Sequence, residues 1–116
     1  MKLVRDNIPA IILEKNENCT YAECKDHSLL KKLLENKLIE EVNEFIEADL
    51  LNEAVDVITV LYYLYLEGIK DYGGDATITL DQFLKSINSE AKRKIELNGG
   101  FEKGYILFDK KDLKEE

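Results

Sequence analysis

The sequence has few of the residues that mark fibrous, disulfide-rich or linker-like proteins. Its 116 residues contain two cysteines, one proline, six glycines and no tryptophan. Cys19 and Cys24 cannot form a disulfide framework, and proline and glycine are too rare for a collagen-like or low-complexity chain. No apolar run reaches the roughly 18–20 residues of a membrane helix, and the first six residues do not resemble a signal peptide. We therefore expect a single domain over residues 1–116, located in the cytoplasm and making no contact with a membrane.

Negative charge is concentrated in one short segment. The formal net charge is −8, and residues 35–56 alone hold eight acidic side chains and one basic side chain. Proteins that bind DNA or RNA present a basic stripe, which this chain lacks. A nucleic acid polymer is therefore excluded as a partner, and a cation is expected instead.

Hydrophobic periodicity predicts an all-α helical bundle. The expected helices cover residues 8–16, with Pro9 in the first turn, 28–48, 50–67 and 80–98. Ser28 and Asp49 are the expected N-caps of the two middle helices, and Gly68 is the expected end of the third. Thr79 and Gln82 have the spacing of a capping box at the start of the last helix.

One small strand pairing is expected beside the helices. Residues 104–108 have the composition of a short strand, and residues 2–4 are the segment suited to pair with them. This would bring the two ends of the chain together. Residues 109–116 are charged and are expected to form a frayed tail.

The third predicted helix carries no charge over residues 57–66. A helix that is apolar on every side is normally buried on every side. We therefore expect this helix to be the centre of a bundle or the seam of a homodimer, which could pair again into a tetramer. Tyr62, Tyr63 and Tyr65 are expected in the core or seam, and stacking on a nucleotide base is the alternative.

Five carboxylates flank the predicted turn between the two middle helices: Glu40, Glu41, Glu44, Glu53 and Asp56. Spacings of three and four residues place side chains on one helical face. Two carboxylates about 5 Å apart repel by roughly 3 kcal/mol at an effective dielectric near 20, and a hard divalent cation such as Mg²⁺ relieves that repulsion. The alternative is that these carboxylates form a solvated acidic surface. For a pattern such as Glu40, Glu41 and Glu44 taken alone, a solvated helix face is more common than a metal site.

The carboxylate pattern, Glu40-Glu41-x-x-Glu44 followed by Glu53-x-x-Asp56, resembles that of the all-α nucleoside triphosphate pyrophosphohydrolases of the MazG superfamily. Residues 2–9 and 99–104 resemble the opening and the ending of one branch, the phosphoribosyl-ATP pyrophosphohydrolase-like house-cleaning proteins. The resemblance implies a helical bundle that dimerises. It also implies Mg²⁺-dependent cleavage of non-standard nucleotides between the α and β phosphates, giving a nucleoside monophosphate and pyrophosphate.

The resemblance also implies roles for individual residues. Four would be the metal ligands, with Mn²⁺ able to replace Mg²⁺: Glu41, Glu44, Glu53 and Asp56. Glu40 would serve a second metal ion or orient the attacking water, so Glu40 and Glu41 are the expected catalytic residues. The cations expected to hold the substrate phosphates are Lys2, Arg5, Arg93 and Lys103.

Two other functions remain open at this stage. One is a phosphoribosyl-ATP pyrophosphatase of histidine biosynthesis, which shares the chemistry. The other is a non-enzymatic acidic helical module that binds a basic protein. The single histidine, His27, is expected at the surface with no role in either.

Overall fold

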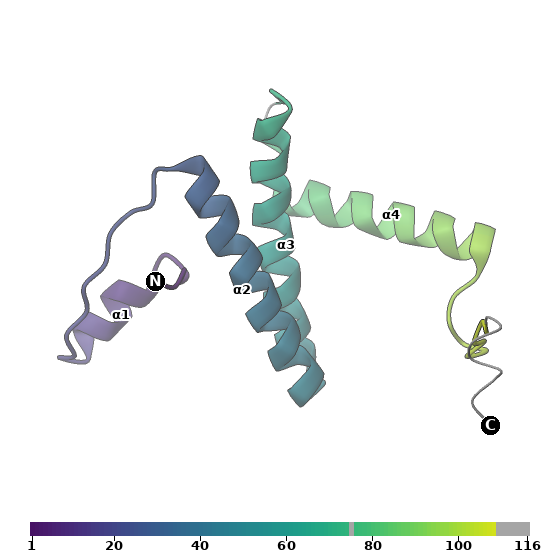
Figure 1. The fold of residues 1–116 in the computed structure, drawn as a ribbon, viewed down its shortest axis with the longest axis horizontal. Helices are drawn as coiled ribbons and strands as arrows, with labels where there is room; N and C mark the ends of the chain where they lie inside the picture. Colours follow the sequence, from purple (N-terminus) through teal and green to yellow (C-terminus); the bar gives the residue numbers. More distant parts are fainter. Residues whose placement is uncertain (75, 109–116) are drawn as a thin grey trace. The chain divides into compact units, whose positions relative to one another are not determined.

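The computed structural model describes residues 1–74 and 76–108, and these residues form an all-helical fold (Figure 1). The helices are α1 (Ile8–Glu14), α2 (His27–Ala48), α3 (Leu51–Asp71) and α4 (Leu80–Asn98). The chain divides into two compact units, Met1–Ile78 and Thr79–Glu116. The all-α prediction is confirmed, and the predicted tail lies outside the described residues. None of these helices is both long and apolar enough to cross a membrane.

The predicted pairing of residues 2–4 with residues 104–108 is wrong, because the described part of the chain contains no strand. A local turn adjoins each segment: the Ile8 amide donates to the Arg5 carbonyl after residues 2–4, and the Gly104 amide donates to the Phe101 carbonyl at the start of residues 104–108. Two isolated strands are marginal in water. Residues 2–5 make ion pairs with α2 and α3 instead, through Lys2 to Glu40 and through Arg5 to Asp56.

Helices α2 and α3 lie side by side and form the main body of the first unit (Figure 1). Only Asp49 and Leu50 separate them, so they run antiparallel. Asp49 adopts the left-handed conformation, with φ of 54°, and its amide donates to the Phe45 carbonyl at 2.7 Å. Asp49 therefore ends α2 and does not cap α3 as predicted, since aspartate tolerates this conformation better than most residues.

The other predicted helix ends are confirmed in part. Pro9 lies in the first turn of α1, and the Thr79–Gln82 capping box at the start of α4 is present with both hydrogen bonds. Asp26 replaces Ser28 as the cap of α2, because its carboxylate accepts from the Leu29 amide at 3.1 Å. Helix α3 continues through Gly68 to Asp71, so Glu67 lies about one turn before the end of the helix and not at its predicted last position.

Two opposite faces of α3 have different surroundings. Glu53, Asp56, Val60, Tyr63 and Glu67 recur every three or four residues and form one stripe on α3. Val60 in this stripe and Leu34 of α2 are buried. The opposite face consists of apolar side chains that are each at least 40 % exposed: Leu51, Val55, Ile58 and Tyr65. One chain alone therefore buries only part of the uncharged segment.

The open end of the α2–α3 hairpin is closed by contacts to Asp71. Its carboxylate lies 2.5 Å from Nε2 of His27 and 2.6 Å from Nζ of Lys31. Hydrogen bonds from Lys31 and then from His27 lower the pKa of Asp71. His27, expected to be without a role, therefore joins the first turn of α2 to the last turn of α3.

Asp71→Asn should lower the melting temperature at about pH 7, and this loss should become smaller as the pH is lowered below about 4. The folded-state pKa of Asp71 lies below its unfolded value, so its stabilisation is present above the unfolded pKa and is lost as the pH falls through the folded pKa. Thermal unfolding followed by circular dichroism measures this difference. Glu17→Gln, in the exposed loop after α1, is the control and should behave as wild type across this pH range. If Asp71→Asn lowered the melting temperature equally at about pH 7 and below about pH 4, the stabilisation by Asp71 would not be electrostatic.

Candidate metal centre between α2 and α3

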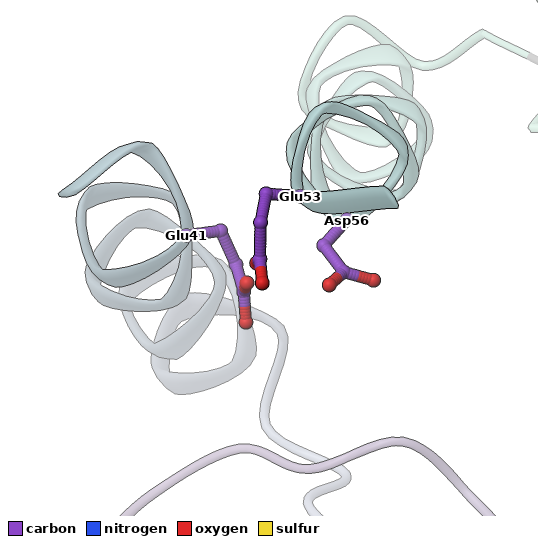
Figure 2. A group of neighbouring side chains, drawn as sticks. All are labelled: Glu41, Glu53 and Asp56. Atoms are coloured by element: carbon purple, nitrogen blue, oxygen red, sulfur yellow. The ribbon is translucent and has the colours of Figure 1, made fainter. Parts of the chain in front are cut away.

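Three carboxylates meet in the space between the two long helices. Glu41 comes from α2, and Glu53 and Asp56 come from the first two turns of α3 (Figure 2). One oxygen atom of each lies within 4.8 Å of the others. The short link through Asp49 brings them together, because it folds α3 back along α2. Three of the four predicted metal ligands therefore form one cluster.

Glu41 is the most unusual member of this cluster, because it is only 7 % exposed. Its Oε1 atom lies 3.2 Å from Nζ of Lys37, one helical turn earlier. Its Oε2 atom is buried and has no hydrogen-bond partner among the residues that the structure describes. A buried carboxylate oxygen without a partner carries a desolvation cost, and nearly all such atoms in proteins are paired. A cation held by the three carboxylates would provide that partner.

Glu44, the fourth predicted ligand, is exposed and lies outside the three-carboxylate cluster. The neighbouring carboxylate of Glu41 raises the pKa of Glu44, first because it can accept a hydrogen bond from the protonated form of Glu44 and then because of its negative charge. Glu53 and Glu40 add smaller repulsions in the same direction. The carboxylates around Glu44 therefore make the surroundings of this side chain negatively charged. The role of Glu44 as a ligand remains a prediction.

Three cations surround the cluster. Arg5 lies closest, with its Nη2 atom 2.7 Å from Oδ1 of Asp56. Lys37 contacts Glu41, and Lys37 and Lys2 both approach Glu40, at 3.5 Å and 3.1 Å. The contact with Lys2, helped by the charge of Lys37, lowers the pKa of Glu40. The N-terminal segment therefore brings Lys2 and Arg5 to the acidic residues, and their role in holding phosphates remains a prediction.

The other two predicted phosphate ligands belong to the second unit. Arg93 of α4 forms an ion pair with Glu90 at 2.9 Å, and Nζ of Lys103 lies 5.7 Å from the centre of the Tyr105 ring. The contacts within that unit are those of ordinary surface cations. Their predicted roles remain predictions.

A cavity of about 480 Å³ adjoins the carboxylates and continues along the hairpin. At one end it is lined by charged side chains: Arg5, Lys37, Glu41 and Asp56. Its middle is mainly apolar, and Glu67 and Lys70 line the cavity on the last turns of α3. This volume is in the range of small-molecule sites, which combine apolar walls with a few polar groups.

Glu67 is the residue of this cavity that sequence reasoning missed. It is buried, and it follows Glu53, Asp56, Val60 and Tyr63 in the same three-and-four spacing. That spacing was the available signal. Glu67 is the last residue of the helix predicted over residues 50–67, and a charged residue at a helix end is normally exposed, so its burial was not predicted.

Comparison with known proteins returned no family model, no curated protein and no solved structure that matches this chain. The resemblance to the MazG superfamily therefore rests on the sequence motifs alone. Which metal ion the three carboxylates could bind follows from the chemistry of their oxygen atoms. Three carboxylates supply only hard oxygen ligands, which suit Mg²⁺ and Mn²⁺ and not softer metals. The orphaned Oε2 of Glu41 fits such an ion.

Glu53→Gln should raise the melting temperature in chelator by about 4 °C and reduce the further increase caused by Mg²⁺. The substitution removes one of three repelling charges, and no cation among the described residues forms an ion pair with Glu53. Differential scanning calorimetry with and without Mg²⁺ measures both effects.

The matched control for this change is Glu47→Gln, an exposed residue of α2 outside the cluster. It should keep the full Mg²⁺ effect. If Glu53→Gln and Glu47→Gln respond alike to Mg²⁺, the three carboxylates do not form a cation site.

Proposed function

We propose that this protein is a magnesium-dependent nucleotide pyrophosphohydrolase that acts in the cytoplasm on non-standard nucleotides. It would cleave between the α and β phosphates and release a nucleoside monophosphate and pyrophosphate. The observation that carries the proposal is the buried, unpartnered Oε2 of Glu41, which lies in a three-carboxylate cluster at the wall of a cavity. The motif resemblance points to the same chemistry.

Glu41, Glu53 and Asp56 would hold the cation. When bound, Mg²⁺ lowers the pKa of a coordinated water and offsets the negative charge of the phosphates. Mn²⁺ has the same preference for oxygen ligands and could replace it. Glu44 at the edge of the cluster would add a further carboxylate, and Glu40 beside Lys2 would orient the attacking water.

Arg5 and Lys37 would hold the phosphates. Both now contact the carboxylates, at 2.7 Å from Asp56 and 3.2 Å from Glu41. A divalent cation on those carboxylates would compete with both contacts and leave the two side chains to bind phosphate oxygens beside it. The planar guanidinium of Arg5 is suited to two parallel hydrogen bonds with a phosphate.

The burial of Glu41 favours this function over an acidic binding module. A surface that attracts a basic protein presents its carboxylates to solvent, whereas Glu41 is buried and its cluster faces a cavity. A phosphoribosyl-ATP pyrophosphatase uses the same chemistry and is distinguished by its substrate. Pyrophosphate release across a panel of nucleotides that includes phosphoribosyl-ATP, with and without Mg²⁺, therefore tests the proposal and separates the two enzymes.

Asp56→Asn should reduce kcat for pyrophosphate release at least about a hundredfold, since even indirect supports of metal sites cost 10–100-fold when removed. The change keeps the shape of the side chain and removes one ligand charge. Glu47→Gln should keep wild-type kcat. The proposal fails if no nucleotide releases pyrophosphate with Mg²⁺, or if Asp56→Asn retains both hydrolysis and the thermal effect of Mg²⁺.

We also propose that the protein is a homodimer whose seam includes the outer face of α3. This face consists of Leu51, Val55, Ile58 and Tyr65, which point away from the stripe that lines the cavity and remain exposed in one chain. Apolar surface of this kind on a small protein is normally covered. A second copy offers the same apolar face, as a two-fold interface requires.

Ile58→Glu should convert the dimer to a monomer at micromolar concentration, because it would bury a carboxylate without a partner in each half of the seam. Light scattering measures the mass, and circular dichroism shows whether the helices remain. Glu47→Gln should remain dimeric. A wild-type protein that is monomeric at this concentration would rule out the seam.

A further inference from the structure

The end of the cavity remote from the metal centre holds a second buried carboxylate, and we propose that it recognises the base of the substrate. The base would be one with the hydrogen-bonding edge of guanine. This inference rests on the proposed function, because it takes the substrate to be a nucleotide with its phosphates at the three-carboxylate cluster. It assigns a role to Glu67, His27 and Lys70, which that chemistry does not use.

The two polar ends of the cavity are separated by a distance suited to a nucleotide. Asp56 and Glu67 are eleven residues apart on the same face of α3, which corresponds to about 16 Å along the helix. Both line the same cavity. A nucleotide whose phosphates lie beside Asp56 would therefore extend its base toward Glu67.

The middle of the cavity offers a suitable surface for the base and sugar. It is lined by Leu34, Val60, Leu66 and the ring of Tyr63. Tyr63 is 51 % exposed, and its ring meets Tyr62 edge to face at 5.1 Å, which leaves a face of Tyr63 available. Aromatic side chains stack on every base without much preference, so selection must come from the polar end.

Glu67 provides that polar end. It is only 5 % exposed, and its Oε2 atom lies 2.7 Å from Nζ of Lys70 and 3.7 Å from Nδ1 of His27. Neither contact has hydrogen-bond geometry: Oε2 of Glu67 and Nδ1 of His27 are both buried and lack a hydrogen-bond partner within residues 1–74 and 76–108. Glu67 lines the cavity and, among the described residues there, has only the ion pair with Lys70, so a ligand that donates hydrogen bonds to Glu67 and to the neighbouring Nδ1 of His27 would satisfy both atoms.

The pattern of donors and acceptors selects the base. The carboxylate of Glu67 only accepts hydrogen bonds, and Lys70 only donates them. A neutral His27 that donates from Nε2 to Asp71 offers Nδ1 as a second acceptor beside Glu67. Guanine presents two adjacent donors, N1–H and the N2 amino group, which complement the two acceptors, and its O6 complements the donor Lys70. Adenine and cytosine place a ring acceptor beside their amino group, and uracil has one N–H between two carbonyls. Each of those bases offers one donor group with an acceptor next to it, so one of the two adjacent acceptors, Glu67 or Nδ1 of His27, would face another acceptor, which is costly in a buried site.

Nucleosides test this site without phosphate or metal. Isothermal titration of the protein with guanosine, inosine and adenosine in chelator should show that guanosine binds at least about tenfold more tightly than the other two. Inosine is the matched ligand, since it lacks only the N2 amino group of guanosine. If guanosine fails to bind, or binds no more tightly than inosine and adenosine, the assignment is overturned.

Glu67→Gln should reduce guanosine binding at least about tenfold, because it replaces one acceptor with a donor. It should also raise KM for GTP more than it lowers kcat. Glu47→Gln should bind guanosine as wild type does, and circular dichroism confirms that each variant is folded. A folded Glu67→Gln protein with unchanged guanosine affinity overturns the assignment.

The two proposals fail in different ways. Pyrophosphate release without a preference for guanosine overturns the base assignment and leaves the hydrolase intact. A guanosine preference without pyrophosphate release from any nucleotide supports the base site and overturns the hydrolase.

Discussion

The burial of Glu41 between α2 and α3 is the constraint on which the rest of this site depends. A carboxylate that is removed from water needs compensation, and Lys37 contacts only one of its two oxygens. Glu53 and Asp56 add negative charge within 4.8 Å and increase the imbalance. Arg5 reduces it from the N-terminal segment. The arrangement is understandable if a divalent cation completes it, because hard oxygen ligands and excess negative charge are what such an ion requires.

The helical stripe that carries this cluster also organises the cavity. One face of α3 presents Glu53 and Asp56 near its start, Val60 and Tyr63 in its middle and Glu67 near its end. The link of two residues lays α2 along that face. A single helix therefore supplies the proposed metal ligands, the apolar wall and the proposed base contact. The opposite face is left with exposed apolar side chains, which is the basis for the proposed dimer.

Much of this organisation was predictable from local patterns. The uneven placement of charge and the spacing of Glu41, Glu53 and Asp56 predicted an acidic cluster across a helical turn, and the structure brings those three together. The Thr79–Gln82 capping box was predictable because both of its hydrogen bonds form within one turn of helix. The strand pairing failed because residues that are far apart in sequence pair only if tertiary packing supports them. Glu44 was placed by its spacing, yet lies outside the cluster.

Local sequence patterns were enough to predict the helices, the apolar stripes and the concentration of acidic residues around the turn, because periodicity and charge spacing act over three or four residues. Only the tertiary structure decided which oxygen of Glu41 is left without a partner and that Arg5 reaches Asp56 from fifty-one positions away. It also decided that His27 meets Glu67 and Asp71 across the open end of the hairpin. These contacts depend on how α2 lies against α3, and burial, which sets the cost of an unpaired polar atom, exists only once the helices have packed.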